Sequence, residues 1–425
     1  MKKLISLVAT FLAVNFAFAD SYAIVGGTVH TMDEQGVIKG GTVLIQDGII
    51  ERVTVEQTVP DGYTVVDASG KVITPGFFGA LTSLGLVEVS SSSGVADASI
   101  EATPVSTTGA ALDVQYAINP DSSLFAVTRL EGVTSAATAV NGSKYLFGGL
   151  GAIIQLSGQS PIRKSAAFMT IDVGSEGAEH SGGSRAALWV MLDKVLNEAA
   201  NASDSLSPEK PWYGLNTRLD VEALKQVLSG DVPLLMRADR AADILQVIAF
   251  KDRHPSINVV LVHGVEAWRV ASKLATANIP VIIDPEYNLP GGFDQMGATM
   301  SNAARLHRAG VSVAIGMDTH NIRLAAQHAG NAVANGLPHE AALRSLTLVP
   351  AQIFGLEEVV GSLKSGRKAD VVIWSGDPLE VTEVAELVFI DGVPVKMESR
   401  QTKLRDRYLS LGVNSSKPSQ CQRTD

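Results

Sequence analysis

The 425-residue chain is poor in cysteine, in aromatic residues and in positive charge. Its single cysteine, Cys421, excludes a disulfide within one chain, so packing has to hold the fold together. Lysine and arginine number 34 against 44 acidic residues, and the formal net charge of −10 argues against a nucleic-acid partner, because phosphates require basic patches. Hydrophobic residues make up 46% of the chain, which suits one large core and excludes a disordered protein.

Long apolar runs are missing except at the N-terminus. Lys2 and Lys3 precede an apolar stretch over residues 4–18, and Ala17-Phe18-Ala19 supplies the small residues of a cleavage site. This pattern predicts a secretory signal peptide over residues 1–19. The stretch is shorter than the roughly 20 apolar residues of a membrane anchor. We therefore expect export, into a bacterial periplasm, and no membrane attachment after cleavage.

Both ends of the remaining chain contain short apolar segments separated by turn dipeptides. Residues 20–74 hold segments such as 22–25 and 42–45 between turns such as Asp47-Gly48, and residues 351–400 show the same texture. The pattern predicts antiparallel strands that form one small β-sandwich built from both chain ends. Residues 401–425 are expected to be a polar C-terminal tail.

The region between them, residues 75–350, alternates strands with helices. Four short, β-branched segments begin at Leu234, Val259, Val281 and Val311, with room for a helix in each interval. Such repeats over this length predict a (β/α)8 TIM barrel, which usually takes about 250 residues. A doubly wound open sheet is the alternative, but no G-x-G-x-x-G follows an early strand.

The middle of the chain is less regular. Residues 132–134 are expected to begin the second barrel strand, whereas the glycine-rich stretches 90–94 and 148–151 are expected to be loops. Residues 175–184 predict a mobile loop above the barrel, a position from which long loops often cover active sites.

Several motifs resemble the amidohydrolase superfamily. They are Pro75-Gly76 after the first β segment, the pattern Ala342-Leu343…Thr347…Pro350-Ala351…Gly355-Leu356, and Gly361-Ser-Leu-Lys-Ser-Gly-Arg-Lys-Ala-Asp-Val-Val-Ile-Trp374. The chain is most similar to the imidazolonepropionase-like periplasmic branch, through residues 241–244, 266–268 and 329–337. The resemblance implies a urease-like β-sandwich beside a TIM barrel, whose mouth takes a small-molecule substrate and hydrolyses C–N bonds in cyclic amides or related compounds.

The same resemblance implies one or two divalent metal ions, which activate water by lowering its pKa. The implied ligands are a His-x-His on the first barrel strand, a bridging lysine carbamate or acid, a histidine on each of strands five and six, and an aspartate on strand eight. In this chain Leu81 and Ser83 stand at the paired histidines, and Arg237 stands at the strand-five histidine. His263 and Asp318 match the last two positions, as metal ligands.

Charge makes these replacements serious. Arginine is always protonated and offers no lone pair, so Arg237 repels a dication at this place. Catalytic zinc usually has three protein ligands, and only His263 and Asp318 remain. We therefore expect a degenerate metal site in which Arg237 replaces the metal and pairs with Asp318. The cofactor is then one divalent metal such as zinc, or none. The sequence does not place the bridging residue of strand three or four, for which Lys164 is a weak candidate.

Three functions stay open from the sequence. The first is a hydrolase with an atypical metal site that recruits His180 or His320. The second is a catalytically inactive binding protein, or the partner of an active homologue. The third is a metal-free enzyme in which Asp318 is the general base and Arg237 the electrophile. Two of these residues also have a purely structural alternative: His263 can be a packed histidine, and Asp318 can be the N-cap of a helix. The substrate and the oligomeric state are not determined.

Overall fold

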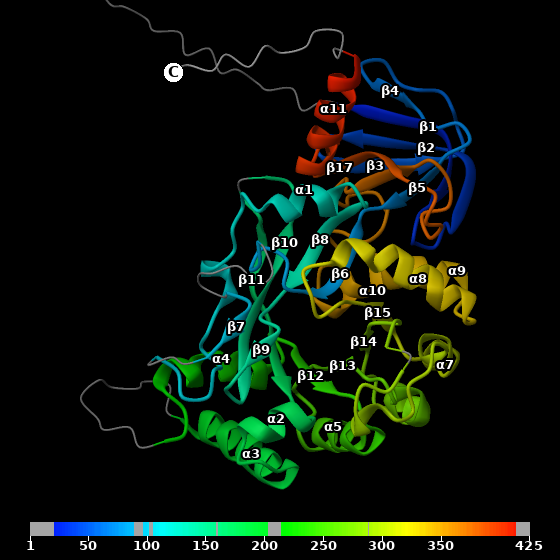
Figure 1. The fold of residues 1–425 in the computed structure, drawn as a ribbon. Coiled ribbons are helices and arrows are strands. Elements are labelled where there is room, and N and C mark those ends of the chain that lie inside the picture. Colours follow the sequence, from blue (N-terminus) through cyan, green and yellow to red (C-terminus); the bar gives the residue numbers. More distant parts are fainter. Residues whose placement is uncertain are drawn as a thin grey trace, which may run out of the picture.

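The computed structural model describes residues 21–88, 97–101, 105–158, 160–202, 214–287 and 289–413. The predicted signal peptide, the expected loop at 90–94 and Cys421 lie outside these ranges. Within them, no helix combines the length and the apolar character needed to cross a bilayer. Two large sheets dominate the molecule, and the helices of the barrel surround one of them (Figure 1).

The first large sheet is the barrel. Its eight strands neighbour one another in chain order. They are β6 (Phe77–Thr82), β8 (Val133–Thr138), β10 (Phe147–Gln155), β11 (Ile162–Asp172), β12 (Leu234–Ala238), β13 (Val259–His263), β14 (Val281–Ile283) and β15 (Val313–Ile315). Just beyond β15, the Met317 amide donates to the Leu81 carbonyl at 2.9 Å and brings the two ends together. The sheet is therefore a nearly closed, TIM-barrel-like structure, as the sequence predicted.

One strand departs from the expected parallel arrangement. β10 runs antiparallel to both neighbours, β8 and β11, and forms a long hairpin with β11 (Figure 1). The prediction of a loop at 148–151 was wrong, because these residues lie inside β10. A side chain at Gly151 would have its Cβ 2.2 Å from the Phe168 ring on β11. Glycine here allows close packing against a large neighbour and does not mark a loop.

Helices follow most strands from β11 onward. The helices of the described residues are α1 (Ser123–Arg129), which precedes β8, and α2 (Ser175–His180), α3 (Arg185–Asn201), α4 (Arg218–Ser229), α5 (Ala241–Arg253), α6 (Ala271–Thr276), α7 (Asn302–Arg308), α8 (Ala325–Ala334), α9 (His339–Ser345), α10 (Leu348–Ile353) and α11 (Arg400–Val413). Short 3-10 turns lie at Val114–Tyr116, Ala267–Val270, Phe293–Gln295 and Ile322–Leu324. The stretch predicted as a loop at 175–184 contains α2, whose start is bound by the side chain of Asp172.

The second large sheet draws strands from both chain ends. They are β1 (Tyr22–His30), β2 (Val37–Gln46), β3 (Ile49–Thr54), β4 (Thr64–Asp67), β5 (Val72–Pro75), β16 (Val371–Trp374), β17 (Ala385–Ile390) and β18 (Val393–Pro394). β1 pairs in parallel with β4 and β5, so the expectation of a purely antiparallel module was wrong. The strands enclose a separate core of residues such as Ile24, Val43 and Phe389. A two-stranded sheet joins β7 (Ser99–Ile100) to β9 (Gly142–Ser143).

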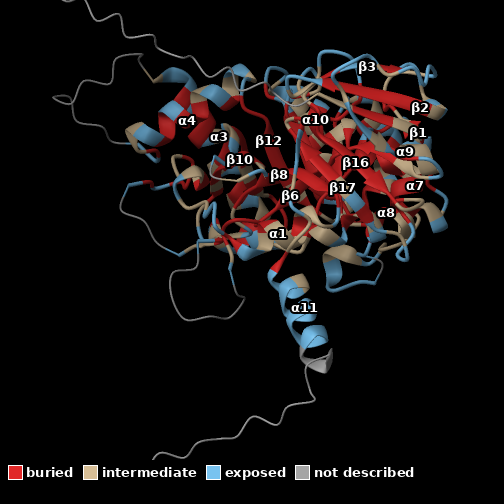
Figure 2. Ribbon diagram, turned by 90° about the horizontal axis from the view of Figure 1, so that it is seen from above, coloured by how far each residue is buried: buried red, intermediate tan, exposed pale blue. Residues whose placement is uncertain are grey.

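Burial follows these two sheets. The strands are buried throughout most of their length, while outer faces of the helices are exposed (Figure 2). α11 projects from the body and is almost wholly exposed (Figure 2). The barrel strands thus form a rigid frame whose C-terminal ends present side chains at one opening, which we call the barrel mouth.

Candidate functional site

Five side chains come to the barrel mouth from the ends of different strands. Leu81 lies at the end of β6, Asp172 at the end of β11, Arg237 on β12, His263 at the end of β13, and Asp318 three residues beyond β15. In β12 and β11, Arg237 is the register partner of Asp172. The buried, β-branched strands fix these positions, because their apolar side chains leave no freedom for the frame to shift.

Arg237 is held between two carboxylates. Its Nη1 donates to Asp318 Oδ2 at 2.6 Å, and its Nε lies 3.5 Å from Asp172 Oδ2. Burial would lower the pKa of the guanidinium, but the Asp318 and Asp172 carboxylates raise it above its ordinary value. The contact between Arg237 and Asp318 that the sequence predicted is therefore present, and it is charge-assisted and short.

The Asp318 carboxyl responds in the opposite direction. Burial would raise its pKa, but His263 and Arg237 together hold the pKa below its ordinary value. Asp318 is thus ionised at neutral pH, with one of its oxygens occupied by the guanidinium. A carboxylate in this state is a weak proton acceptor.

His263 is buried, with 5% of its surface exposed, and it lies between two aspartates. Its Nδ1 is 3.8 Å from Asp239 Oδ1 and its Nε2 is 3.7 Å from Asp318 Oδ2. These distances exceed those of hydrogen bonds, so neither ring nitrogen has a hydrogen-bond partner among the described residues. The two carboxylates nevertheless raise the pKa of His263 above its ordinary value, against the effect of burial. The backbone φ of +68° is uncommon for a residue other than glycine, and such strain concentrates at functional sites.

The two positions where histidines were expected are buried. Leu81 reaches the barrel mouth and Ser83 is completely covered, with no hydrogen-bond partner for its Oγ among the described residues. A leucine side chain has no lone pair, and the buried Ser83 hydroxyl is a weak ligand. The first strand therefore contributes an apolar wall to the site.

A small cavity of about 70 Å³, open to solvent, lies at the barrel mouth. We call it the mouth cavity. Its walls include Asp172, Glu176, His180, Arg237 and Asp318 on the polar side. Leu81, Val140, Leu146, Leu235 and Val262 form the apolar side. Arg237 and Asp318, the two residues to which the sequence assigned catalytic roles, thus both face this cavity.

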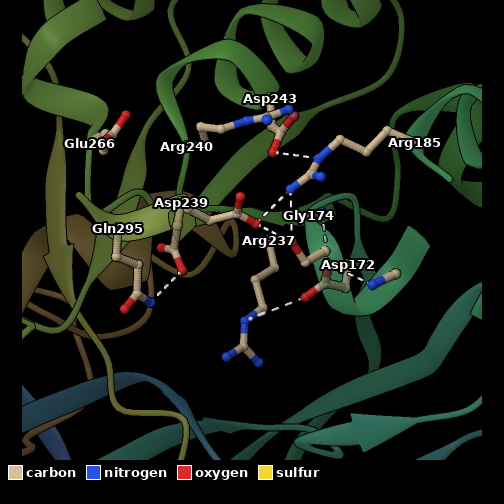
Figure 3. A network of polar contacts seen from close by, with 12 residues as sticks. Asp172, Gly174, Arg185, Arg237, Asp239, Arg240, Asp243, Glu266 and Gln295 are labelled. Atoms are coloured by element: carbon tan, nitrogen blue, oxygen red, sulfur yellow. Dashed lines mark hydrogen bonds and ion pairs between the residues drawn. The ribbon is translucent and has the colours of Figure 1, made fainter. Parts of the chain in front are cut away.

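A network of polar contacts lies beside Arg237 and includes Asp243 of α5 (Figure 3). Arg185 Nε lies 2.9 Å from Asp243 Oδ2, and its Nη2 lies 2.5 Å from Asp294 Oδ2. Gln295 donates its amide to Asp239 at 2.8 Å. These contacts tie the loop after β14 to the start of α3 and to the end of β12. They restrict the movement of the backbone that carries Arg237.

Other residues that the sequence singled out have different places. Lys164 donates to the Phe354 carbonyl at 3.0 Å and lies eight residues before Asp172 on β11. Because a strand rises about 3.3 Å per residue, this position is roughly 26 Å from the mouth, so the bridging role was wrong. His180, on α2, lines the mouth cavity. The pKa of His320 is lowered by burial and by Arg323, which disfavours a charged ring there.

Asp172 is the residue that the sequence interpretation missed. It ends β11, it contacts Arg237, and its Oδ1 accepts from the amides of Gly174 and Gly177. An acid directly after the apolar run 166–171 was the available signal, because the C-terminal end of a barrel strand is where functional groups lie. The irregular region before β11 hid that strand.

Comparison with known proteins bears on this fold and site. The model of the amidohydrolase family matches residues 251–397. The structure is similar to that of an amidohydrolase from Thermotoga maritima, with a TM-score of 0.78 and 29% identity over 88% of this chain and 99% of that one. The chain belongs to the amidohydrolase superfamily. Family membership supports hydrolysis of C–N bonds as the general reaction class.

Two further similarities are more limited. The structure of an adenosine deaminase from Xanthomonas campestris, crystallised with zinc, has a TM-score of 0.50 and 17% identity over 92% of this chain and 99% of that one, and this shows a shared fold. A 57-residue segment, 13% of this chain, is 46% identical to the amidohydrolase tasK of Hapsidospora irregularis. That segment spans only 6% of the fungal protein.

The amidohydrolase family is typically metal-dependent, and the side chains of this site fit a metal poorly. No three histidine, cysteine, aspartate or glutamate side chains in the described ranges converge to hold an ion. Arg237 instead brings a permanent positive charge to Asp318. Two like unit charges 4 Å apart repel each other by about 4 kcal/mol at an effective dielectric of 20, and a divalent ion doubles the repulsion. A dication beside Arg237 is strongly disfavoured.

Proposed function

We propose that this amidohydrolase-fold protein binds a small organic ligand at the barrel mouth without a metal ion, and that Arg237 occupies the place of the family's metal. The observation that carries this proposal is the 2.6 Å contact between Arg237 Nη1 and Asp318 Oδ2. The pair neutralises the carboxylate that a metal would need. It leaves beside it a cavity with polar and apolar walls, which suits ligand binding.

Hydrolysis by these residues alone has little support. Asp318 would act as the general base. Burial alone would raise its pKa, but His263 and Arg237 hold the pKa below its ordinary value. A base works best when its pKa lies near the working pH. With Arg237 engaged by two carboxylates, an amide carbonyl gains little polarisation from it. Binding therefore explains the geometry better than metal-free catalysis does.

The test is zinc binding by the purified protein and by a variant with the missing ligands restored. We expect less than about 0.2 zinc per wild-type chain after equilibration with excess zinc and gel filtration, because two ligands do not hold catalytic zinc. The triple variant Leu81→His/Ser83→His/Arg237→His is expected to hold about one zinc per chain. The matched control, Leu81→Ala/Ser83→Ala/Arg237→Ala, removes the arginine without adding donors. Stoichiometric zinc in the wild type would overturn the proposal.

A second function is favoured by one observation. Both ring nitrogens of the buried His263 lack a hydrogen-bond partner among the described residues, and Nε2 lies 3.7 Å from Asp318 Oδ2. These two donors are the nucleus of an atypical mononuclear site in a C–N hydrolase of cyclic amide-type substrates. In that case turnover of such amides disappears on treatment with a chelator and returns with zinc. The same turnover is lost in the His263→Ala variant, and the zinc assay finds metal in the wild-type protein.

Export to the periplasm is part of the same proposal. It is supported by Lys2 and Lys3, the apolar stretch at 4–18 and the small residues at 17–19. N-terminal sequencing of the protein from the periplasmic fraction is expected to begin at Asp20, and recovery of intact protein in the cytoplasm would contradict export. Association with an active homologue, or with further copies of the chain, is the partner proposal that size-exclusion chromatography checks.

A further inference from the structure

We infer that α11 of one copy of this chain docks on the loop that follows β14 in a second copy. The two surfaces are an exposed basic helix, α11 (Arg400–Val413), and an exposed apolar loop formed by residues 284–287 and 289–297, which we call the β14 loop. Association between copies is part of the proposed function, and this contact assigns its two surfaces. The contact does not involve a metal at the barrel mouth, so the zinc assay and the experiment below fail separately.

α11 is a helix that its own chain leaves almost uncovered. It lies against α1, and the rest of it projects from the body (Figure 2). Leu404 and Tyr408, four residues apart and hence on one face, are 37% and 66% exposed. A helix of this length is marginally stable in water unless one face is packed. The apolar face of α11 is therefore expected to be covered in the assembled protein.

The charged side chains of α11 are mostly basic. The helix has four cationic residues and one acidic residue, a net charge of +3 in a chain whose net charge is −10. At about 3.6 residues per turn, Arg405 and Arg407 flank the apolar face, whereas Asp406 lies on the opposite side. Two such helices would repel each other if they paired through these faces. The helix therefore fits a partner surface that is both apolar and acidic.

The β14 loop is such a surface. Leu289, Phe293 and Met296 are 77%, 92% and 64% exposed, and three large apolar side chains within eight residues of one loop indicate an interaction surface. The sequence of the loop has three acidic residues and no lysine or arginine. One of them, Asp294, is paired with Arg185, so a net charge of −2 remains when histidine is counted as neutral.

The backbone of the β14 loop is fixed in place by polar contacts. Gln295 donates its side-chain amide to Asp239 at 2.8 Å. The indole of Trp268 donates to the Gly297 carbonyl, also at 2.8 Å. The exposed side chain of Phe293 is thus carried by an ordered backbone. A surface that is ordered beforehand loses less conformational entropy on association.

The two surfaces lie on different parts of the molecule. α11 stands beside the second large sheet, whereas β14 lies in the barrel with α5 and α7 (Figure 1). The helix projects away from the body, so it does not cover the β14 loop of its own chain (Figure 2). In a second copy the opposite charges and the two apolar surfaces meet. Because Tyr287 of this loop lies against His263, with ring centroids 5.1 Å apart, the docked helix borders the barrel mouth.

Sedimentation velocity measures the self-association of the purified protein. We expect a dissociation constant on the order of 10 μM, as for a small and transient interface, and weaker association as salt increases. Leu404→Asp/Tyr408→Asp and Phe293→Asp/Met296→Asp are each expected to weaken the association at least about tenfold, because the contact then buries carboxylates.

A matched control changes two exposed valines elsewhere. Val381 and Val384, which lie between β16 and β17, are 74% and 58% exposed. Val381→Asp/Val384→Asp introduces the same charges away from both surfaces, and it is expected to retain the wild-type affinity. A loss of association in this variant equal to that in the other two would overturn the assignment of the contact.

A mixture of the α11 variant and the β14-loop variant is the decisive measurement. Each variant lacks one surface and keeps the other, so the mixture is expected to form a one-to-one complex although neither variant associates alone. Such a complex also shows that both variants are folded. A monomeric wild type, association that neither variant weakens, or a mixture that stays monomeric would overturn the inference. Binding of a monomeric wild type to vesicles of anionic phospholipid, lost in the α11 variant, would assign the helix to a lipid surface instead.

Discussion

Two arginines in this protein each lie between two aspartates, and their surroundings differ. Arg163, at the start of β11, contacts Asp370 and Asp391 of the second sheet, at 3.2 and 3.3 Å. Its side chain is 8% exposed and Asp370 is 3% exposed. Arg237, on the next strand, is 29% exposed and its carboxylates face the mouth cavity. The same chemistry thus joins two sheets in one place and lines a cavity in the other.

The difference shows that the solvent exposure of an ion pair determines how much stability is lost when one partner is removed. Around Arg163, Gln155 accepts a further hydrogen bond, and the amide of Asp391 donates to Asp370. Arg163 and Asp370 are therefore enclosed by protein, whereas Asp391 is 32% exposed. Around Arg237 the charges are enclosed on one side only. Removing one member of an enclosed ion pair strongly destabilises the protein, because the remaining charge stays buried without a partner. Beside a cavity, water can solvate the remaining charge. Four predictions test this comparison, from the largest expected effect to the smallest.

Arg163→Met is expected to lower the free energy of unfolding by about 3–5 kcal/mol, because it leaves the Asp370 carboxylate buried without a counter-charge. Denaturant unfolding measures the change. Adding Asp370→Asn to this variant is expected to recover much of the loss. The surface pair Lys144–Glu101 is the control, and Lys144→Met is expected to change stability by no more than about 1 kcal/mol. A loss of that small size in Arg163→Met would remove the distinction.

Arg237→Met is expected to cost less, about 2 kcal/mol, since water from the mouth cavity can solvate Asp172 and Asp318 after the guanidinium is gone. The same denaturant measurement applies. A cost equal to that of Arg163→Met would mean that the mouth is as enclosed as the junction between the sheets. The comparison would then fail.

The pH dependence of stability separates the two carboxylates that contact Arg237. The folded-state pKa of Asp318 is lowered, so its ionisation stabilises the protein above the ordinary pKa of 3.8, and that contribution is lost as the pH falls through the folded-state pKa. For Asp172 the folded-state pKa is raised, so stability is gained as the pH falls through it toward 3.8. Thermal unfolding between pH 3 and 7 measures this. Asp318→Asn should remove a contribution that increases stability with rising pH, and Asp172→Asn one that decreases it. Slopes of one sign would contradict this assignment.

Lys164→Met is expected to have the smallest effect, about 0.5–1 kcal/mol, because it removes one hydrogen bond to the Phe354 carbonyl far from the mouth. Denaturant unfolding measures this change, and a loss as large as that of Arg163→Met would contradict the minor role of this contact.

Much of the barrel could be predicted from the sequence, and the failures have a common cause. The strands β12 to β15 were found because each is a short β-branched run between helices, a local pattern. β10 was missed because Gly148, Gly149 and Gly151 resemble a loop. Gly148 and Gly151 let β10 pack closely against Thr170 and Phe168 of β11, and Gly149 lies against Leu112. These contacts depend on partners that the local pattern does not reveal.

The site divides in the same way. Arg237, His263 and Asp318 were predicted to lie together, because strand ends of a barrel meet at one opening. Asp172 was missed and Lys164 was misplaced, since the direction and register of β10 and β11 decide which end of a strand reaches the mouth. α2 was taken for a mobile loop because it has only six residues and its N-cap residue, Gly174, has no side chain to mark the start of a helix.

By itself, the sequence determined that the chain folds as an α/β barrel, that Leu81, Ser83 and Arg237 stand where metal ligands were expected, and that an arginine and an aspartate share the barrel mouth. These follow from side-chain chemistry and from local periodicity. Only the tertiary structure decided that Arg237 is shared between Asp318 and Asp172, that His263 is buried without a hydrogen-bond partner in the described chain, and that the mouth cavity has more carboxylates than cations. Distances and burial set these properties, because they arise between strands that are remote in the sequence.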